Sequence, residues 1–188
     1  MQRRFFVFLD PSVLPDDALT VFGSDDAYVL GVLSSRVHCD WAAATGSRLI
    51  SVLRYDKMRC FDAFPFPEAT DKQKASIRDI AEKLDAHRKT RQKLHPDLTL
   101  AELYGVLEKV QKGEQLTAKE RKTSEEGDVV TLKKLHEELD FAVFEAYGWP
   151  ANSTTRDIIS NLFELNQKRA AEEASGKIRW LCNQPKSA

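Results

Sequence analysis

The chain has 188 residues, of which 42% are hydrophobic and 30% charged, and its formal net charge is −1. This composition excludes a disordered chain, and no apolar run approaches the roughly 20 residues of a membrane helix, so we expect no membrane partner. Three widely separated cysteines exclude a disulfide framework and predict a reducing, cytoplasmic location. Basic groups still outnumber acidic ones by five to two over residues 36–59, which would present a positive surface despite the small net charge.

The first 68 residues combine extended and helical patterns. Residues 5–9 form an apolar run ended by an Asp-Pro pair, which predicts a buried strand, and residues 21–23 predict a second short strand. Residues 24–45 predict one helix, with a serine as its N-cap and apolar residues at four-residue spacing. Residues 48–66 favour extended structure, because they lack a helical period and end in Phe-Pro-Phe-Pro. A strand at the very start is typical of a chain that begins within a domain.

Helical signals dominate the remainder of the chain, residues 69–188. Capping boxes begin at Thr70 and Thr99, and apolar residues at helical spacing follow each of them. A further helix stops at the Gly-Trp-Pro sequence of residues 148–150. We therefore predict an α+β fold, with a small mixed strand and helix first half, residues 1–68, followed by a mainly α-helical half.

The sequence offers no catalytic motif. Methyl transfer to an adenine would need a glycine-rich cofactor turn and a polar-Pro-Pro-aromatic motif for the extruded base, and neither occurs. Pro96-Asp97 with Glu120-Arg121-Lys122 matches a nuclease pattern, but charged helices produce Glu-x-Lys by chance. The four histidines lack the spacing of a metal site. We predict no catalytic residue, no metal and no cofactor bound by this chain.

A basic segment with interleaved hydroxyl groups is the candidate for nucleic-acid contact. Guanidinium and ammonium groups bind phosphate, hydroxyls help to fix register, and arginine can also read guanine. The candidate residues are Arg48, Arg54, Tyr55, Lys57 and Arg59. An alternative is an ordinary exposed sheet edge whose charges discourage aggregation.

Three further candidates for DNA contact lie in the preceding predicted helix. They are Ser35, Arg36 and His38. For Arg36 and His38, a helix surface that faces the rest of the domain explains the sequence equally well. The basic residues of the helix predicted after Thr70 fit a solvated face better than a DNA site, because acidic residues lie at pairing distance along it.

Several motifs in order resemble the MmeI-like (type IIL) methyltransferases of restriction–modification systems. Within the first 68 residues they are DAYVLGVLSSRVH at 26–38 with Trp41, RYDKMRCF at 54–61 and FPFP at 64–67. In the helical half they are LDAHR at 84–88, LTL at 98–100, HEELD at 136–140, AYGWP at 146–150, RAAEE at 169–173 and RWL at 179–181. The resemblance covers nearly the whole chain. One departure is Asp56, where the family usually has asparagine.

The resemblance implies a function for a longer protein. Such a protein would use S-adenosylmethionine to methylate adenine N6 in a defined double-stranded DNA sequence, sometimes with a fused nuclease. Residues 1–68 would be the end of its target-recognition domain and residues 69–188 a helical tail, joined to an upstream methyltransferase domain of the same chain. The alternative is a helical assembly or specificity-subunit module that acts through protein–protein contacts, because the Phe-Pro-Phe-Pro junction before a long helix is also similar to type I specificity subunits.

Overall fold

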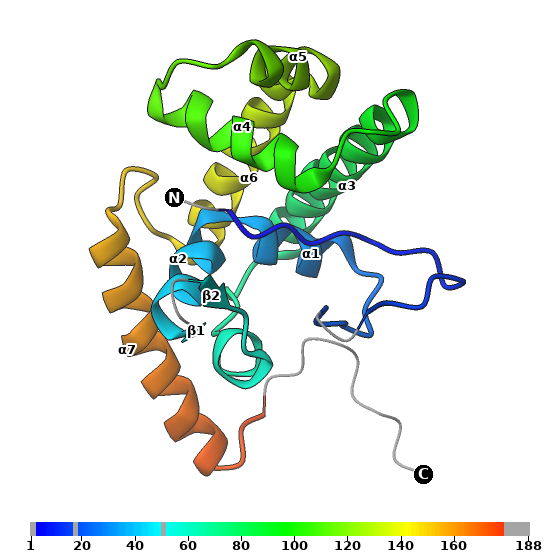
Figure 1. Cartoon of the computed structure of the whole chain (residues 1–188). Helices are drawn as coiled ribbons and strands as arrows, with labels where there is room; N and C mark the ends of the chain where they lie inside the picture. Colours follow the sequence, from blue (N-terminus) through cyan, green and yellow to red (C-terminus); the bar gives the residue numbers. More distant parts are fainter. Residues whose placement is uncertain (1–2, 17–18, 50–51, 179–188) are drawn as a thin grey trace. The chain divides into compact units, whose positions relative to one another are not determined.

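The computed structural model describes residues 3–16, 19–49 and 52–178, and most of this part is helical (Figure 1). Seven α-helices, one two-stranded hairpin and one π-helical turn, η1, occur within these ranges. In chain order they are α1 (Ala27–Ser34), α2 (Arg36–Thr45), β1 (Ser47–Leu49), β2 (Val52–Arg54), η1 (Lys57–Asp62), α3 (Asp71–Leu94), α4 (Leu100–Lys112), α5 (Ala118–Gly127), α6 (Val129–Tyr147) and α7 (Thr155–Ala174).

The predicted α+β fold is wrong, because the described residues are mostly helical and the strands predicted over residues 5–9 and 21–23 do not form. Residues 5–9 and 21–23 have no strand pairing. Instead of a neighbouring strand, the Phe6 carbonyl accepts a hydrogen bond from the Arg88 guanidinium at 2.8 Å. Phe6 and Phe8 pack against a buried cluster contributed by α1 and α3. Phe6 and Phe8 are therefore partly buried against helices while Phe5 and Leu9 are exposed, and periodicity alone cannot separate this arrangement from a buried strand.

The extended segment predicted over residues 48–66 is short in the structure. β1 and β2 pair in antiparallel fashion, with Ser47 opposite Arg54 and Leu49 opposite Val52. The chain then turns into η1, and the Asp56 side chain accepts from the Arg59 amide at the start of this turn. A side-chain acceptor satisfies an amide that has no partner in the first turn of a helix. Extended structure therefore ends where this N-cap begins.

The single helix predicted over residues 24–45 is two helices. Asp26, and not Ser24, caps α1, because its side chain accepts from the Tyr28 amide. The helix breaks at Ser35, whose φ of −74° and ψ of 161° are extended. The Ser35 hydroxyl donates to the Val32 carbonyl at 2.7 Å, which satisfies a carbonyl at the end of α1.

The helix boundaries predicted for the second half are confirmed. Thr70 forms a capping box with Gln73 at the start of α3, and Thr99 caps α4. Gly148 ends α6 in the left-handed region, at φ 70°, where glycine avoids the steric penalty of a side chain. Within the described ranges, none of these helices is long and apolar enough to span a membrane.

The chain divides into two compact units that interleave along the sequence. Unit 1 comprises residues 1–13, 26–39 and 67–152, and unit 2 comprises residues 14–25, 40–66 and 153–188. The boundary between residues 68 and 69, which the resemblance places between the end of a recognition domain and a helical tail, stays a prediction.

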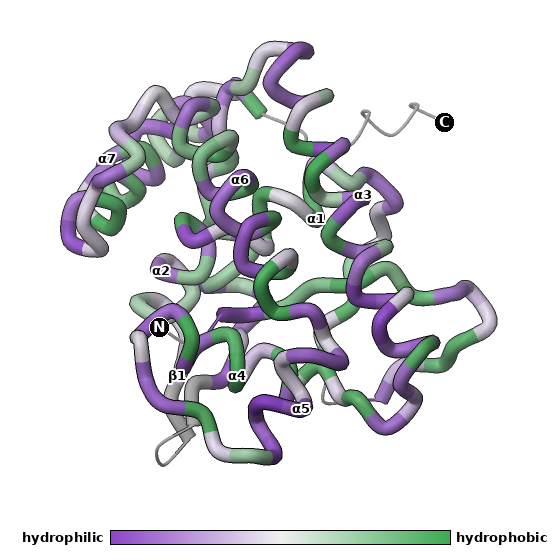
Figure 2. The backbone as a smooth tube through the Cα atoms, turned by 90° about the horizontal axis from the view of Figure 1, so that it is seen from above, coloured by the Kyte–Doolittle hydropathy of each residue, from purple (hydrophilic) through white to green (hydrophobic). Residues whose placement is uncertain are grey.

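Unit 1 is built on the packing of α3 against α1 and α6. Both α3 and α6 carry hydrophilic and hydrophobic stretches along their lengths (Figure 2). Their apolar positions include the fully buried Ile77, Leu84 and Leu139. Gly31 of α1 permits close approach, because a Cβ there would lie 2.7 Å from a methyl carbon of Ile77.

Candidate nucleic-acid interface

Unit 2 contains an aromatic layer beneath the basic segment. Trp41 lies 6.2 Å from Phe64 between ring centroids, and Phe64 lies 5.1 Å from Phe66. Phe61 contacts Phe66 and also Phe22, at 6.1 and 4.2 Å. The aromatic residues of the Phe-Pro-Phe-Pro junction are thus buried core residues. Aromatic side chains bury large areas in such clusters and hold the overlying chain in place.

The η1 turn is fixed by its backbone. The Asp56 Oδ1 accepts from the Arg59 amide at 3.2 Å, and the Trp41 indole Nε1 donates to the Arg59 carbonyl at 3.2 Å. Cys60 is fully buried next to Arg59. Both peptide groups of Arg59 are therefore held while its side chain stays exposed. The Asp56 carboxylate, where the family usually has asparagine, serves as an N-cap, a role that asparagine also fills.

Gly46 joins α2 to the hairpin through a close backbone approach. A Cβ at this position would lie 2.6 Å from the Ala42 carbonyl oxygen and 2.9 Å from the Arg54 carbonyl oxygen. It would also lie 3.5 Å from the Cys60 sulfur. A side chain therefore cannot fit without shifting backbone, so glycine at this position permits the close approach of the end of α2 to Arg54, the last residue of β2.

Three of the five principal candidates are exposed on one short segment. The side chains of Arg54, Lys57 and Arg59 are solvent-accessible. Lys57 pairs with Asp62, its Nζ lying 2.8 Å from both carboxylate oxygens. The fourth candidate, Tyr55, is half-buried, with its ring 6.4 Å from that of Phe22.

The fifth candidate, Arg48, lies in β1 opposite Leu53. Its side chain is outside the described part of the structure. The segment therefore presents two cations, Arg54 and Arg59, that have solvent access, and a third, Lys57, whose charge is partly offset by Asp62.

Two of the three further candidates are buried. Ser35 and His38 are both 0% exposed. Burial lowers the pKa of His38 to about 3, so its imidazole is neutral at physiological pH. Arg36 is half-buried, and its amide donates to the Asp140 carboxylate at 2.7 Å. A side chain without exposed surface cannot reach DNA, so Ser35 and His38 do not enter the proposal below.

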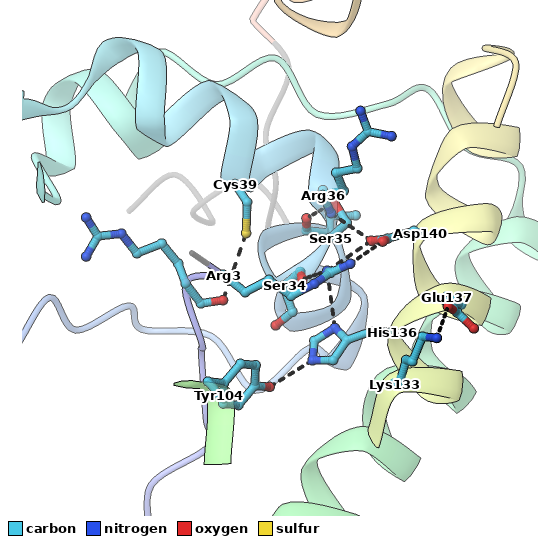
Figure 3. Close-up of polar contacts among 12 residues, drawn as sticks. Arg3, Ser34, Ser35, Arg36, Cys39, Tyr104, Lys133, His136, Glu137 and Asp140 are labelled. Atoms are coloured by element: carbon cyan, nitrogen blue, oxygen red, sulfur yellow. Dashed lines mark hydrogen bonds and ion pairs between the residues drawn. The ribbon is translucent and has the colours of Figure 1, made fainter. Parts of the chain in front are cut away.

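A buried polar network in unit 1 was missed by the sequence reasoning (Figure 3). The Arg3 guanidinium forms an ion pair with Asp140 and donates to the Ser34 carbonyl. The same guanidinium lies 3.3 Å from His136 Nδ1, and His136 Nε2 lies 2.9 Å from the Tyr104 hydroxyl. Because arginine cannot accept a hydrogen bond, Nδ1 must accept, which places the imidazole hydrogen on Nε2.

This network extends to a second buried arginine. Arg88, which is 1% exposed, donates to the Tyr104 hydroxyl at 3.0 Å and lies 3.3 Å from Asp85. Burial, together with the positive charges of Arg3 and Arg88, holds the pKa of His136 well below its usual value. The residues of this network hydrogen-bond to one another within the core of unit 1, so the network has a structural role.

One carboxylate of α6 is largely buried. The Glu137 and Glu138 side chains are 61% and 47% exposed, whereas the Asp140 side chain is 15% exposed and carries the ion pair to Arg3. Its four-residue spacing from His136 was the available signal, because that spacing places both on one helix face. The partner, 137 positions away in sequence, gave no local sign.

The residues of the nuclease-like pattern do not gather into a site. Asp97 is exposed in the loop before α4. Glu120 caps α5 and pairs with Lys109 at 2.6 Å, and this hydrogen bond lowers its pKa to about 2. Within residues 3–16, 19–49 and 52–178, no three His, Cys, Asp or Glu side chains cluster as metal ligands would.

Comparisons with known proteins identify the relatives of this chain. Residues 3–68 match the family model "MmeI, target recognition domain". A sequence relative is DNA methyltransferase A of Bacillus subtilis (strain 168), which is 29% identical over 171 residues and covers 89% of this chain. A solved structure of the type IIL restriction–modification enzyme MmeI in complex with DNA matches 79% of this chain with a TM-score of 0.60 and 29% identity.

The chain spans 17% of the length of each of these two relatives. The family model covers α1, α2, the β1–β2 hairpin and η1, and it ends just before α3. Both relatives also match much of the helical half. The chain therefore resembles these MmeI-like proteins over most of its length, and its residues 3–68 match the model of the MmeI target recognition domain.

Proposed function

We propose that this chain serves in DNA sequence recognition as part of a restriction–modification DNA adenine-N6 methyltransferase. The carrying observation is that the matched domain contains one backbone-fixed segment, β2 with η1, on which Arg54, Lys57 and Arg59 are exposed. A solved relative was determined with DNA bound, which supports a duplex as the partner. The proposed contact set is Arg48, Arg54, Tyr55, Lys57 and Arg59, and Arg36 remains a separate candidate.

The chemistry of the segment suits both kinds of DNA contact. Exposed guanidinium groups neutralise phosphates, and they also pair in a bidentate manner with guanine in the major groove. Base reading needs side chains held at defined positions, and the backbone of Arg59 is held by Trp41 and Asp56. The segment is thus suited to present arginines at a fixed register.

The cofactor would belong to the rest of a longer protein. The described residues do not fit S-adenosylmethionine, because their strands form an antiparallel hairpin and Gly46 packs against the Ala42 and Arg54 carbonyls. A glycine-rich cofactor turn instead follows a strand and leaves backbone amides open to the ligand. We propose that an upstream methyltransferase domain of the same chain binds this cofactor and carries out the methyl transfer.

The test is binding of the full chain to a fluorescently labelled duplex of mixed sequence, measured by anisotropy across a salt series. Arg54→Ala and Lys57→Ala should each lower affinity and reduce the salt slope by about one for each lost phosphate contact. Lys57→Ala should have the smaller effect, because Asp62 already offsets its charge. Lys83→Ala, an exposed and paired lysine of α3, is the matched control. Unchanged binding by both segment variants at low salt would overturn the assignment.

A second candidate function is an assembly module, and α6 favours it. Val130 and Phe141 are 76% and 54% exposed, and Phe141 lines a shallow groove with Ile80 of α3. Exposed apolar side chains of this size are typical of protein contacts. Sedimentation equilibrium distinguishes the two functions: a concentration-dependent dimer that Phe141→Ser abolishes, in a chain that ignores DNA, would favour assembly.

A further inference from the structure

The last helix presents a stripe that ends in an amide. Ile158 and Leu162 of α7 are both fully buried, and Asn166 follows four residues later with partial burial. Residues at this spacing share one helix face. The face that α7 buries is therefore apolar in its first half and polar at Asn166 (Figure 1, orange helix).

The amide of Asn166 reaches the end of η1. Its Nδ2 donates to the Ala63 carbonyl at 2.6 Å. Ala63 is the C-cap of η1, and its own amide donates to the Met58 and Phe61 carbonyls. Ala63 is thus tied to η1 through its amide and to α7 through its carbonyl, at the point where the chain leaves the turn for the buried Phe64.

We propose that Asn166 is a positioning residue for DNA recognition, acting through η1, and that α7 belongs to the recognition machinery although it lies outside the matched residues 3–68. This inference rests on the proposed function. Asp56 and Trp41 hold η1 at Arg59, and Asn166 holds it at Ala63. The exposed side chains of Lys57 and Arg59 lie on the turn so held.

The proposal separates two kinds of binding. Phosphate contact tolerates small displacements, because it depends on charge and distance, whereas base reading needs donors at defined positions. Loss of the Asn166 bond should therefore weaken discrimination between sequences more than it weakens binding to DNA in general. A merely structural loss, which lowers the folded fraction, would weaken both in the same proportion.

The experiment compares full-length chains that carry Asn166→Ala, Asn166→Asp or Gln167→Ala with the wild type. The aspartate variant keeps the shape of the side chain but removes the donor, so it separates the hydrogen bond from packing. Gln167 is exposed on the same helix turn and serves as the matched control. Amide hydrogen exchange of residues 57–63 tests the hold on η1 without DNA, and enrichment from a duplex pool with a randomised centre tests sequence discrimination.

We expect exchange over residues 57–63 to be about five-fold faster in both Asn166 variants, the ratio that corresponds to one net hydrogen bond. We also expect their enrichment of the wild-type sequences to fall at least as much, with affinity for a mixed-sequence duplex within two-fold of wild type, taking about a factor of two as the additivity error. Gln167→Ala should match the wild type in both assays.

Unchanged exchange in the Asn166 variants would overturn the inference, whatever happens with DNA. Faster exchange with unchanged enrichment would also overturn it, because the hold would then have no consequence for recognition. A wild-type chain that binds no duplex and enriches no sequence would contradict the proposed function itself. That outcome is recognised by the wild type alone, so it is distinguishable from a failure of the Asn166 variants.

Discussion

Replacing Gly46 by alanine tests the close backbone approach between α2 and the β1–β2 hairpin. The added methyl group would lie 2.6 Å from one backbone carbonyl oxygen, that of Ala42, and 2.9 Å from another, that of Arg54. Both neighbours are backbone atoms, so neither can rotate away as the end of a long side chain could. Either the end of α2 or the end of β2 must move.

The expected cost follows from measured effects of overpacking. An extra methylene in a well-packed site destabilises a protein by about 1–3 kcal/mol. Gly105→Ala is the matched control, because the same methyl group would meet nothing within 4 Å on the exposed face of α4. In a helix interior this change stabilises by about 0.5–1 kcal/mol. The two variants should therefore differ by about 1.5–4 kcal/mol.

Urea unfolding followed by circular dichroism measures both variants against the wild type. Gly46→Ala should unfold at lower urea and Gly105→Ala at higher urea, with similar m values. Gly46→Ala should also bind duplex DNA more weakly than Gly105→Ala, because Arg54 moves with its carbonyl. A Gly46→Ala chain as stable as the Gly105→Ala chain would refute the close approach of α2 to β2.

Three further predictions concern stability. Asp140→Ala strips the buried Arg3 of its carboxylate and the Arg36 amide of its acceptor, so it should cost about 3–5 kcal/mol by urea unfolding; a cost under about 1 kcal/mol would mean that water screens the pair. The folded His38 binds a proton near pH 3 and the unfolded one near 6.5, so the unfolded state takes up more protons between these values. The free energy of unfolding should therefore fall by about 2 kcal/mol from pH 7 to pH 5 through this residue, and His38→Gln should flatten that part of the pH profile; an unchanged slope would show that the imidazole is accessible. Thr70→Ala removes the capping box of α3 and should cost about 1 kcal/mol, whereas a neutral effect would show that the first turn of α3 is frayed.

Local signals predicted the helical half well. Thr70, Thr99 and Gly148 mark helix ends through interactions with residues a few positions away, so these helix ends can be predicted from the local sequence. The exposure of the basic segment was also predictable in part, because Arg54 and Arg59 lie in a stretch rich in charged residues.

Long-range partners account for the errors in the fold. The run at residues 5–9 has strand-like residues, but its backbone partner is Arg88, which lies on α3. Asp140 has the sequence context of a surface carboxylate, but its side chain pairs with Arg3. No pattern within a window of a few residues carries this information, because the determining contact joins segments far apart in the chain.

Local sequence patterns also failed to predict the burial of two candidate site residues. Ser35 lies at the break between α1 and α2 and His38 in the first turn of α2, and both side chains are fully buried. Helical spacing predicts one exposed face, and that expectation fails where other elements enclose a helix on several sides. The contribution of Asn166 was hidden for a related reason, since it meets Ala63 from 103 positions away.

We propose that the hairpin and η1 form the DNA-contact surface. The most direct test is amide hydrogen exchange of the full chain with and without duplex DNA at low salt. We expect slower exchange over residues 47–62 when DNA is present, and we expect the double variant Arg54→Ala with Arg59→Ala to lose this protection. Protection confined to α6, or none at any segment, would contradict it.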